Sequence, residues 1–540
     1  MRTIRLLLLA FLSLALLGAA PPSFTPYLVK DINPYPSPDS SNPSSFATLG
    51  RLTLFQVSGS LSANVDHQGL WRSDGTASGT YLLMAADYVQ SLTVAGDRCF
   101  FGFLADGRWY LGVTDGTLPG TFTLTEVPPW WGGPGVWVPR QRLFYFPLPA
   151  ESAGVQATKL WRSDGAPGGT YEVADLAAVP GASGLRELTS FQGRLYFAAG
   201  SALWRSDGTA AGTVKVLDVQ AASLQVVGSS LVFAGTDAQG SELWASDGTS
   251  AGTRRIADLT PGAGSTTFNA FKLVGKRLFF SATTQARGDE LYVTDGTAQG
   301  TQRLTWFASP SALAFDSWRP APMAALGDRL LFASGTQLWS SDGTPRGTRV
   351  VLDVAPGGQP STLSDFLQQR GRIYFRAGIG LWVTDGTATG TRKLKDAVPG
   401  LAGRWRWIAD PSGDRAFLAV NEEAFGIETW LWSTDGTAGG TVELSDFFYE
   451  DLSVDGAAVG GTLLLAGYDE DHGVELWRSD GTPAGTRLLT DIAPEDLGGS
   501  NPHHLMTLGD SVLFFAGETP TRYALWRSEG TEAGTTVLNT

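Results

Sequence analysis

The sequence has 540 residues, a formal net charge of −14 and a single cysteine, Cys99. A surface with this excess of acidic groups repels phosphate backbones and anionic lipids, so we expect no nucleic-acid partner and no membrane insertion. One cysteine excludes an intramolecular disulfide, and the 18 tryptophans and 28 phenylalanines supply the material for a large hydrophobic core.

The N-terminus has the pattern of an export signal. Arg2 and Arg5 precede an unbroken apolar run over residues 6–17, and small residues follow at 18–20. The run is too short to span a bilayer, and it ends where a signal peptidase would cut. We therefore predict a cleaved signal peptide over residues 1–20 and a secreted or periplasmic mature protein, residues 21–540.

One phrase recurs through the rest of the chain. Residues 203–209 read Leu-Trp-Arg-Ser-Asp-Gly-Thr, and Gly212 and Thr213 follow after two residues. Eleven copies stand 40 to 50 residues apart, which is the signature of a repeat architecture. We assign their recurring tryptophans and acidic residues to a structural motif: Trp71, Asp74, Asp115, Trp161, Asp164, Trp204, Asp207, Trp244, Asp247, Asp295, Trp339, Asp342, Trp382, Asp385, Trp432, Asp435, Trp477, Asp480, Trp526 and Glu529.

Each period contains four short β-branched or aromatic segments between Gly-rich turns. In the copy around Asp207 they are residues 185–189, 194–198, 202–206 and 213–217. Four antiparallel strands per period predict an all-β fold, a β-propeller, in preference to an open solenoid with shorter rungs. Eleven repeats form either one large ring or two rings of five and six. One of the terminal segments 27–32 and 535–538 is expected to close a ring by pairing between the termini.

The Asp-Gly-Thr phrase is typical of a tight turn, because Gly takes positive φ and Asp bonds its own backbone. The alternative is calcium binding by the aspartates and loop carbonyls. No copy has the alternating carboxylates of an EF-hand, and one carboxylate per loop makes a poor calcium site. We therefore expect structural turns and no cofactor, with calcium as the alternative.

The best copies of the phrase are residues 242–249 and 475–482, both Glu-Leu-Trp-x-Ser-Asp-Gly-Thr. On these residues the chain resembles the ELWxxDGT-repeat proteins of bacteria over essentially its whole mature length. The resemblance implies an exported, propeller-like repeat protein, and it implies no established activity.

Residues 234–244 also resemble the tryptophan-docking motif of quinoprotein dehydrogenases, which are propellers too. The resemblance implies shared blade docking. Quinoprotein catalysis needs a cysteine pair, which this chain lacks. An enzyme of this kind, or a hydrolase or lyase with a site in the central channel, is the alternative reading of function.

Two polar clusters are candidate metal ligands. Asp469 and Asp471 flank Glu470 in a hairpin turn, where solvated charge is ordinary, so they are weak candidates. His503 and His504 are adjacent in sequence, and neighbours on a strand point to opposite faces and seldom bind one metal together. We expect no metal site.

Tryptophans outside the repeat are the candidate ligand-binding residues. Trp130, Trp131 and Trp137 follow the second motif, and Trp405 and Trp407 precede the ninth. We place both groups in loops between the last strand of one blade and the first strand of the next. Exposed aromatic rings beside arginine are typical of sugar stacking and protein hot spots. The sequence therefore predicts a non-enzymatic scaffold with a protein or polysaccharide partner, and it leaves the oligomeric state open.

Overall fold

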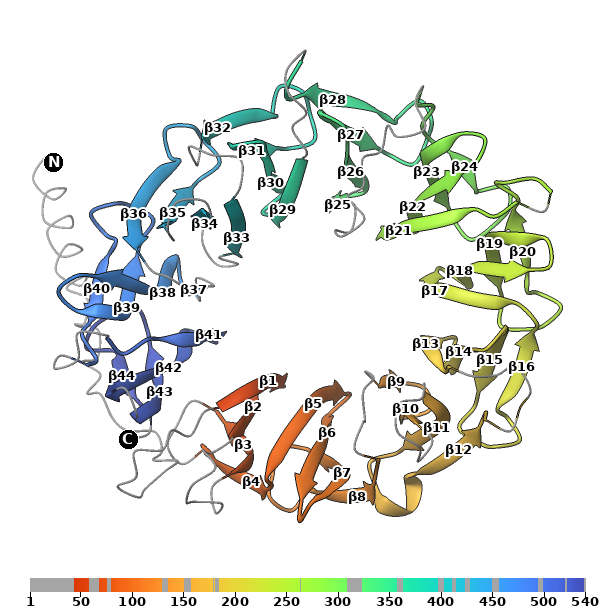
Figure 1. The fold of residues 1–540 in the computed structure, drawn as a ribbon, viewed down its shortest axis with the longest axis horizontal. Coiled ribbons are helices and arrows are strands. Elements are labelled where there is room, and N and C mark those ends of the chain that lie inside the picture. The colour runs from red at the N-terminus through yellow and green to blue at the C-terminus, as the bar shows by residue number, and fades with distance from the viewer. Residues whose placement is uncertain are drawn as a thin grey trace, which may run out of the picture.

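The computed structural model describes residues 43–57, 68–74, 79–128, 135–149, 157–177, 179, 184–262, 264–307, 323–356, 363–396, 403–409, 414–422, 428–448, 456–493, 499–519 and 522–538. Within these ranges the chain forms eleven four-stranded sheets arranged as the blades of one ring (Figure 1). The predicted β-propeller is confirmed, and the ring is single. The predicted strand 27–32 lies outside the described residues.

Each blade uses four consecutive strands in antiparallel order, with its first strand innermost and its fourth outermost (Figure 1). Blades 1 to 4 consist of β1 Pro43–Leu49, β2 Leu52–Val57, β3 Gly69–Ser73, β4 Tyr81–Ala85; β5 Tyr88–Ala95, β6 Arg98–Ala105, β7 Arg108–Thr114, β8 Phe122–Glu126; β9 Val136–Val138, β10 Leu143–Pro149, β11 Ala157–Ser163, β12 Tyr171–Asp175; and β13 Arg186–Phe191, β14 Arg194–Ala199, β15 Ala202–Ser206, β16 Val214–Leu217. A short 3₁₀ helix, η2 Pro167–Gly169, precedes β12.

Blades 5 to 8 consist of β17 Gln220–Val227, β18 Ser230–Asp237, β19 Gly240–Ser246, β20 Arg254–Ala257; β21 Thr267–Val274, β22 Arg277–Thr284, β23 Gly288–Thr294, β24 Gln302–Arg303; β25 Met323–Leu326, β26 Arg329–Ser334, β27 Gln337–Ser341, β28 Arg349–Asp353; and β29 Leu363–Gln369, β30 Arg372–Ala377, β31 Gly380–Thr384, β32 Arg392–Asp396. Blades 9 to 11 consist of β33 Gly403–Ala409, β34 Ala416–Glu422, β35 Glu428–Thr434, β36 Val442–Phe448; β37 Gly456–Val459, β38 Thr462–Asp469, β39 Gly473–Ser479, β40 Arg487–Thr490; and β41 His503–Leu508, β42 Ser511–Thr519, β43 Arg522–Ser528, β44 Thr535–Val537.

The core lies between neighbouring blades. In most blades the motif tryptophan pairs across the sheet with a phenylalanine on the second strand, as Trp244 does with Phe233, whose rings are stacked at 6.4 Å. The same tryptophan packs against the blade before it, in one buried cluster with Tyr196 and Leu203. A blade alone would leave this surface exposed, so burial of the recurring aromatic residues holds the ring together.

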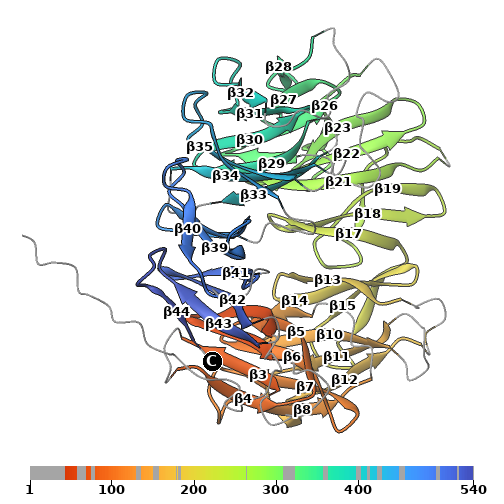
Figure 2. The same ribbon diagram turned by 60° about the vertical axis from the view of Figure 1, so that its left-hand side comes forward.

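The ring closes by packing. Phe55 and Trp71 of blade 1 share a buried cluster with Phe515 and Leu538 of blade 11, and Figures 1 and 2 both show these two blades side by side. The C-terminal strand β44 pairs with β43 of its own blade. Within the described residues every blade is therefore a continuous segment. The predicted pairing between the termini involves residues 27–32, which lie outside the described residues, and it stays a prediction.

Antiparallel order fixes which loops share a face of the ring. The turn between the first and second strands of a blade emerges on the same side as the turn between its third and fourth strands. We call this side, which carries all the Asp-Gly-Thr turns, the corner face. None of the helices found in the described residues has the length and apolar character needed to cross a membrane.

Candidate functional site

The Asp-Gly-Thr corners are turns that satisfy their own polar groups. In blade 5, Oδ1 of Asp247 accepts hydrogen bonds from the backbone N–H of Thr249 at 2.9 Å and from its hydroxyl at 2.7 Å. Gly252 N–H donates to Oγ1 of Thr249 at 3.0 Å, and Gly248 takes φ of +92°. These bonds favour the carboxylate and lower the pKa of Asp247.

The corners also join neighbouring blades. In three blades, the arginine after the motif tryptophan donates through Nη1 to the motif glycine carbonyl of the next blade. These contacts are Arg72 to Gly116 at 2.7 Å, Arg205 to Gly248 at 2.9 Å and Arg478 to Gly530 at 2.7 Å. A second type of contact starts from the first residue of the second strand, where Arg98 donates to Gly165 O at 2.8 Å. We call these contacts arginine latches.

Blade 3 departs from this plan at its corner. The third copy of the motif has Ala166 at the position where the other ten copies have threonine. Asp164 Oδ1 accepts the backbone N–H of Ala166 at 2.9 Å, but Ala166 has no hydroxyl to donate a second bond. The carboxylate of Asp164 therefore has fewer internal partners than that of Asp247, and η2 follows directly.

Blade 3 also departs in its turn between the first and second strands. β9 and β10 are joined by four residues, 139–142, where β5 and β6 are joined by two. Arg142 takes the left-handed conformation, with φ of +54°. A non-glycine residue in this region costs about 1–3 kcal/mol, and such residues cluster at functional sites. The 139–142 turn thus places Arg142 differently from Arg98, which starts the corresponding strand of blade 2.

Two arginines of blade 3, Arg142 and Arg162, line this part of the corner face without forming a latch. Arg142 is exposed, and its guanidinium makes no hydrogen bond or ion pair with another described residue. Arg162 follows the motif tryptophan, and its guanidinium stacks over the ring of Tyr171 at 4.4 Å. The Arg162 guanidinium donates no hydrogen bond within the described part of the chain, and its Nε is buried without a partner. Neither the Arg142 nor the Arg162 guanidinium is therefore bound to a carbonyl or carboxylate of the described residues.

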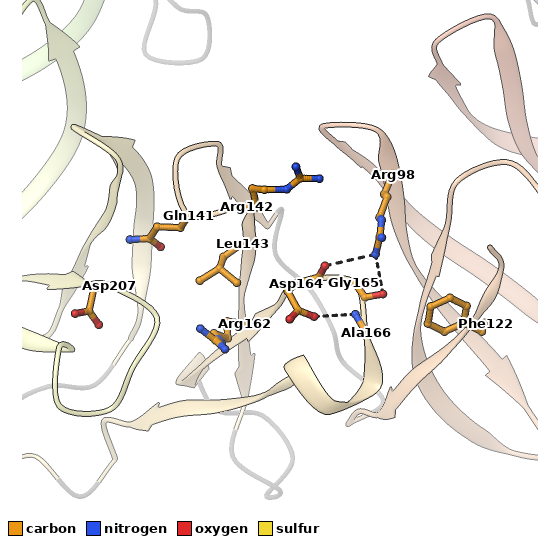
Figure 3. Close-up of a pocket in the computed structure, with 10 residues that line it drawn as sticks. All are labelled: Arg98, Phe122, Gln141, Arg142, Leu143, Arg162, Asp164, Gly165, Ala166 and Asp207. Atoms are coloured by element: carbon orange, nitrogen blue, oxygen red, sulfur yellow. Dashed lines mark hydrogen bonds between the residues drawn. The ribbon is translucent and has the colours of Figure 1, made fainter.

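These departures surround one pocket on the corner face, of about 830 Å³ (Figure 3). Arg98 lines it from the start of β6, Arg142 from the 139–142 turn, and Arg162 from β11. We call this the arginine pocket. It is lined by Arg98, Phe122, Gln141, Arg142, Leu143, Arg162, Asp164, Gly165, Ala166 and Asp207.

Two carboxylates complete the arginine pocket. Oδ1 of Asp207 accepts the N–H of Thr209 at 3.0 Å and its hydroxyl at 2.7 Å. The bond from the Thr209 hydroxyl lowers the pKa of Asp207, and Arg194, 3.9 Å away, acts in the same direction. Asp207 is therefore ionised at neutral pH. The pocket combines three guanidinium groups, which bind carboxylates with paired N–H donors, and two carboxylates, which accept from hydroxyls.

Two of the predicted ligand-binding tryptophans lie on the inner strand β33, so their placement in a loop is wrong. Trp405 is buried in a core cluster, with the Arg376 guanidinium 5.2 Å from its ring. The indole N–H of Trp407 donates to Asp365 O at 2.6 Å, across the blade boundary.

Trp137 lies on the inner strand β9, and it is likewise not in a loop. It packs on the core shared by blades 2 and 3. Trp130 and Trp131 lie outside the described residues. A role of these tryptophans in ligand binding stays a prediction.

The weak metal candidates lie in a compact turn. Oδ1 of Asp469 accepts the N–H of Asp471 at 3.0 Å and lies 2.8 Å from Nδ1 of His472. This bond raises the pKa of His472. Within the described ranges, no group of three histidine, cysteine or carboxylate side chains is placed to hold a metal ion. The expectation of no cofactor stays a prediction.

The expectation that the side chains of His503 and His504 point to opposite faces of the strand is wrong. The rings of His503 and His504 are 5.0 Å apart, and both lie near Phe515. His504 has φ of +55° at a register shift between His503 and Met506. A β-bulge breaks the alternation of side chains, so two successive residues can turn to one side.

Glu242, Glu290 and Glu475 are buried carboxylates that the sequence did not single out as a site. Burial raises the pKa of each. Both oxygens of Glu475 accept hydrogen bonds from the segment that leads to the next blade, including Ile492 N–H at 3.0 Å and Ser500 N–H at 2.9 Å. With no exposed surface, these side chains hold the connections between blades in place.

Comparison with known proteins adds fold-level information. No family model matches the chain, and no curated protein matches it. Membership of the ELWxxDGT family therefore stays a prediction. Solved structures of similar fold include the tricorn protease (14% identity, TM-score 0.25, covering 84% of this chain and 44% of the other) and a prolyl endopeptidase (14%, 0.29, 59% and 49%). A puromycin hydrolase is also similar (15%, 0.26, 64% and 60%).

The chain thus spans about half the length of the structures it matches. All three are named as hydrolytic enzymes, which contradicts the expectation of a non-enzymatic scaffold, and that expectation is dropped. At these identities the likeness concerns the fold alone and assigns no reaction to this chain.

The arginine pocket was missed at the sequence level because its arginines occur at positions that carry arginine in many repeats. Two signals were readable in the sequence. Ala166 breaks the motif in the copy that lines the pocket, and the four-residue turn 139–142 is longer than its two-residue counterparts in every other blade except blade 9. Neither signal contributed to the prediction, which was based on the residues that the copies share.

Proposed function

We propose that the protein binds an acidic sugar, a saccharide that carries a carboxylate, in the arginine pocket. The observation that carries this proposal is that the departures of blade 3 from the repeat line a single pocket. Arg142 and Arg162 line the pocket as blade-3 arginines without a latch, and Ala166 is the residue that breaks the motif. Residues that depart from the repeat pattern in a single blade are best explained by a function at that blade.

The chemistry of the lining supports a sugar acid. Guanidinium groups bind carboxylates with two parallel N–H donors, while Asp164 and Asp207 suit the hydroxyl groups of a sugar. The negative charges of the two aspartates repel a ligand whose only polar groups are anionic. The net charge of −14 opposes anions at long range as well, so binding depends on these local contacts. The predicted export of the chain would expose the pocket to extracellular polysaccharides.

Isothermal titration calorimetry with galacturonate, glucuronate and their neutral parent sugars tests the proposal. We expect the acids to bind and the neutral sugars to bind at least about tenfold more weakly, since a charge-assisted hydrogen bond contributes about 1.5–3 kcal/mol. Arg142→Ala should weaken binding of the acids by a similar factor. Arg142→Lys should restore it only in part, because lysine lacks the paired donors.

Arg349→Ala is the matched control, because Arg349 is exposed on β28 of blade 7, far from the arginine pocket. It should leave binding unchanged. Equal affinity for acidic and neutral sugars, or an Arg142→Ala variant that binds like the unmodified protein, would refute the proposal. Following the same mixtures for release of new reducing ends shows whether a bound saccharide is also cleaved.

A further inference from the structure

We infer that the ligand is an oligosaccharide whose chain crosses the 139–142 turn and occupies a second subsite between blades 3 and 4. This inference rests on the proposed function and deepens it. A second hollow of about 480 Å³ lies on the other side of that turn, and it is lined by Pro139, Arg140, Ser190, Gln192 and Gly193. The two hollows thus flank one turn of blade 3.

The turn presents one arginine to each hollow. Arg142 lines the arginine pocket, and Arg140, two residues earlier, lines the second hollow. Arg140 is exposed and forms no ion pair or hydrogen bond with the described residues. Its stem packs on blade 4, because a Cβ added at Gly193 would stand 2.5 Å from Cδ of Arg140. Two cations on one short turn suit a chain that carries carboxylates at regular intervals.

The turn is held in place by its own hydrogen bonds. Gln141 N–H donates to Val138 O at 3.1 Å, and Arg142 N–H donates to Pro139 O at 3.2 Å. The hydroxyl of Tyr145 donates to Oε1 of Gln141. Because these bonds hold the backbone of the turn before any ligand arrives, binding has to order the two arginine side chains but not the turn that carries them.

The lining of the second hollow favours a saccharide over an acidic peptide. Ser190, Gln192 and the backbone of Gly193 offer hydroxyl, amide and peptide groups, and Pro139 is the one apolar residue. Peptides are usually held by added strands or by apolar pockets for their side chains. Hydroxyl-rich rings are held by small polar contacts of the kind that Ser190 and Gln192 offer.

Titration with oligogalacturonates of one to six units tests the inference. In the unmodified protein, affinity should rise by about tenfold once the chain is long enough to reach the second hollow, the effect of one further carboxylate contact. Arg140→Ala should abolish this gain, and its affinity for the monomer should stay within about twofold, because Arg140 does not line the arginine pocket. Arg349→Ala should keep the gain.

Three results would overturn the inference: affinity that is independent of chain length, a gain that persists in Arg140→Ala, or tighter binding of a glutamate oligopeptide than of an oligogalacturonate with the same number of carboxylates. In each case binding of monomeric galacturonate would still support the proposed function. If the monomer and all oligomers fail to bind, the proposed function itself is wrong, so the two failures can be told apart.

Discussion

Gly212 lies directly against the carboxylate of Asp207, so that a Cβ added at Gly212 would stand 1.9 Å from Oδ1 of Asp207. The same relationship recurs at the other aspartate corners, where the Cβ would stand about 2 Å from the motif carboxylate. In the copy with Glu529 the closest atom to a Cβ at Gly534 is Thr531 Oγ1, at 2.8 Å. The second glycine of the motif is therefore required by the space that the aspartate occupies, in addition to any turn geometry.

Gly212→Ala should destabilise the protein by about 1–3 kcal/mol, because the added methyl group forces the Asp207 carboxylate out of its turn. Thermal unfolding followed by circular dichroism measures the effect. Asp207→Ala removes the atoms that the methyl group would strike, so adding Gly212→Ala to that variant should cost less than it does alone. Gly439→Ala is the control, since a Cβ there has no heavy atom within 4 Å. Additive effects of the two substitutions would contradict this account.

The latch between Arg205 and Gly248 should contribute to the stability of the ring. Arg205→Ala removes a charge-assisted donor to a buried carbonyl and should lower the free energy of unfolding by about 1.5–3 kcal/mol. Arg162→Ala, which removes an arginine without a latch, should cost less. The comparison uses urea unfolding at one pH for both variants. Equal losses would mean that side-chain packing, and not the hydrogen bond, accounts for the effect.

The fold could be predicted from the sequence because every repeat carries the same pattern of strand and turn residues. The expected strands 194–198 and 202–206 correspond to β14 Arg194–Ala199 and β15 Ala202–Ser206, since turn residues bound them on both sides. Ring closure could not be read, because packing between Phe55 and Phe515 leaves no local signal. The bulge at His504 was missed for the same reason, as it depends on pairing between strands.

The candidate site was harder to predict than the fold. Trp405 and Trp407 lie close to arginines in the sequence, which suggested an exposed aromatic surface. In the structure, both rings pack in the core between blades 8 and 9. The arginine pocket is formed by side chains from blades 2, 3 and 4. The sequence of a single repeat does not show which side chains of the neighbouring blades lie beside it.

Trp405→Ala should destabilise the protein by about 3–5 kcal/mol, because it opens a cavity in the core between blades 8 and 9. Trp306→Ala is a matched control, because Trp306 is 60% exposed and the substitution removes the same type of side chain from a surface position. Its effect should stay within about 0.5 kcal/mol. Differential scanning calorimetry compares the two. A Trp405→Ala variant as stable as Trp306→Ala would return Trp405 to the candidates for ligand contact.

Glu475 should make the stability of the protein depend on pH in a defined direction. Burial raises its pKa in the folded state above the ordinary value of 4.5, although hydrogen bonds from Ser500, Ile492 and Ala493 act against the rise. Between these two pKa values the unfolded chain has lost the proton that the folded chain keeps. Stability from this group is therefore fully present below the ordinary pKa and falls as pH rises through the folded value.

Urea unfolding at half-unit steps from pH 4 to pH 8 tests this for the unmodified protein and for Glu475→Gln. The glutamine variant should lose that part of the decline, because its amide does not titrate. Glu532→Gln is the control, since Glu532 is exposed, and its curve should run parallel to that of the unmodified protein. If the Glu475→Gln curve is also parallel, Glu475 keeps an ordinary pKa, and its hydrogen bonds fully offset the effect of its burial.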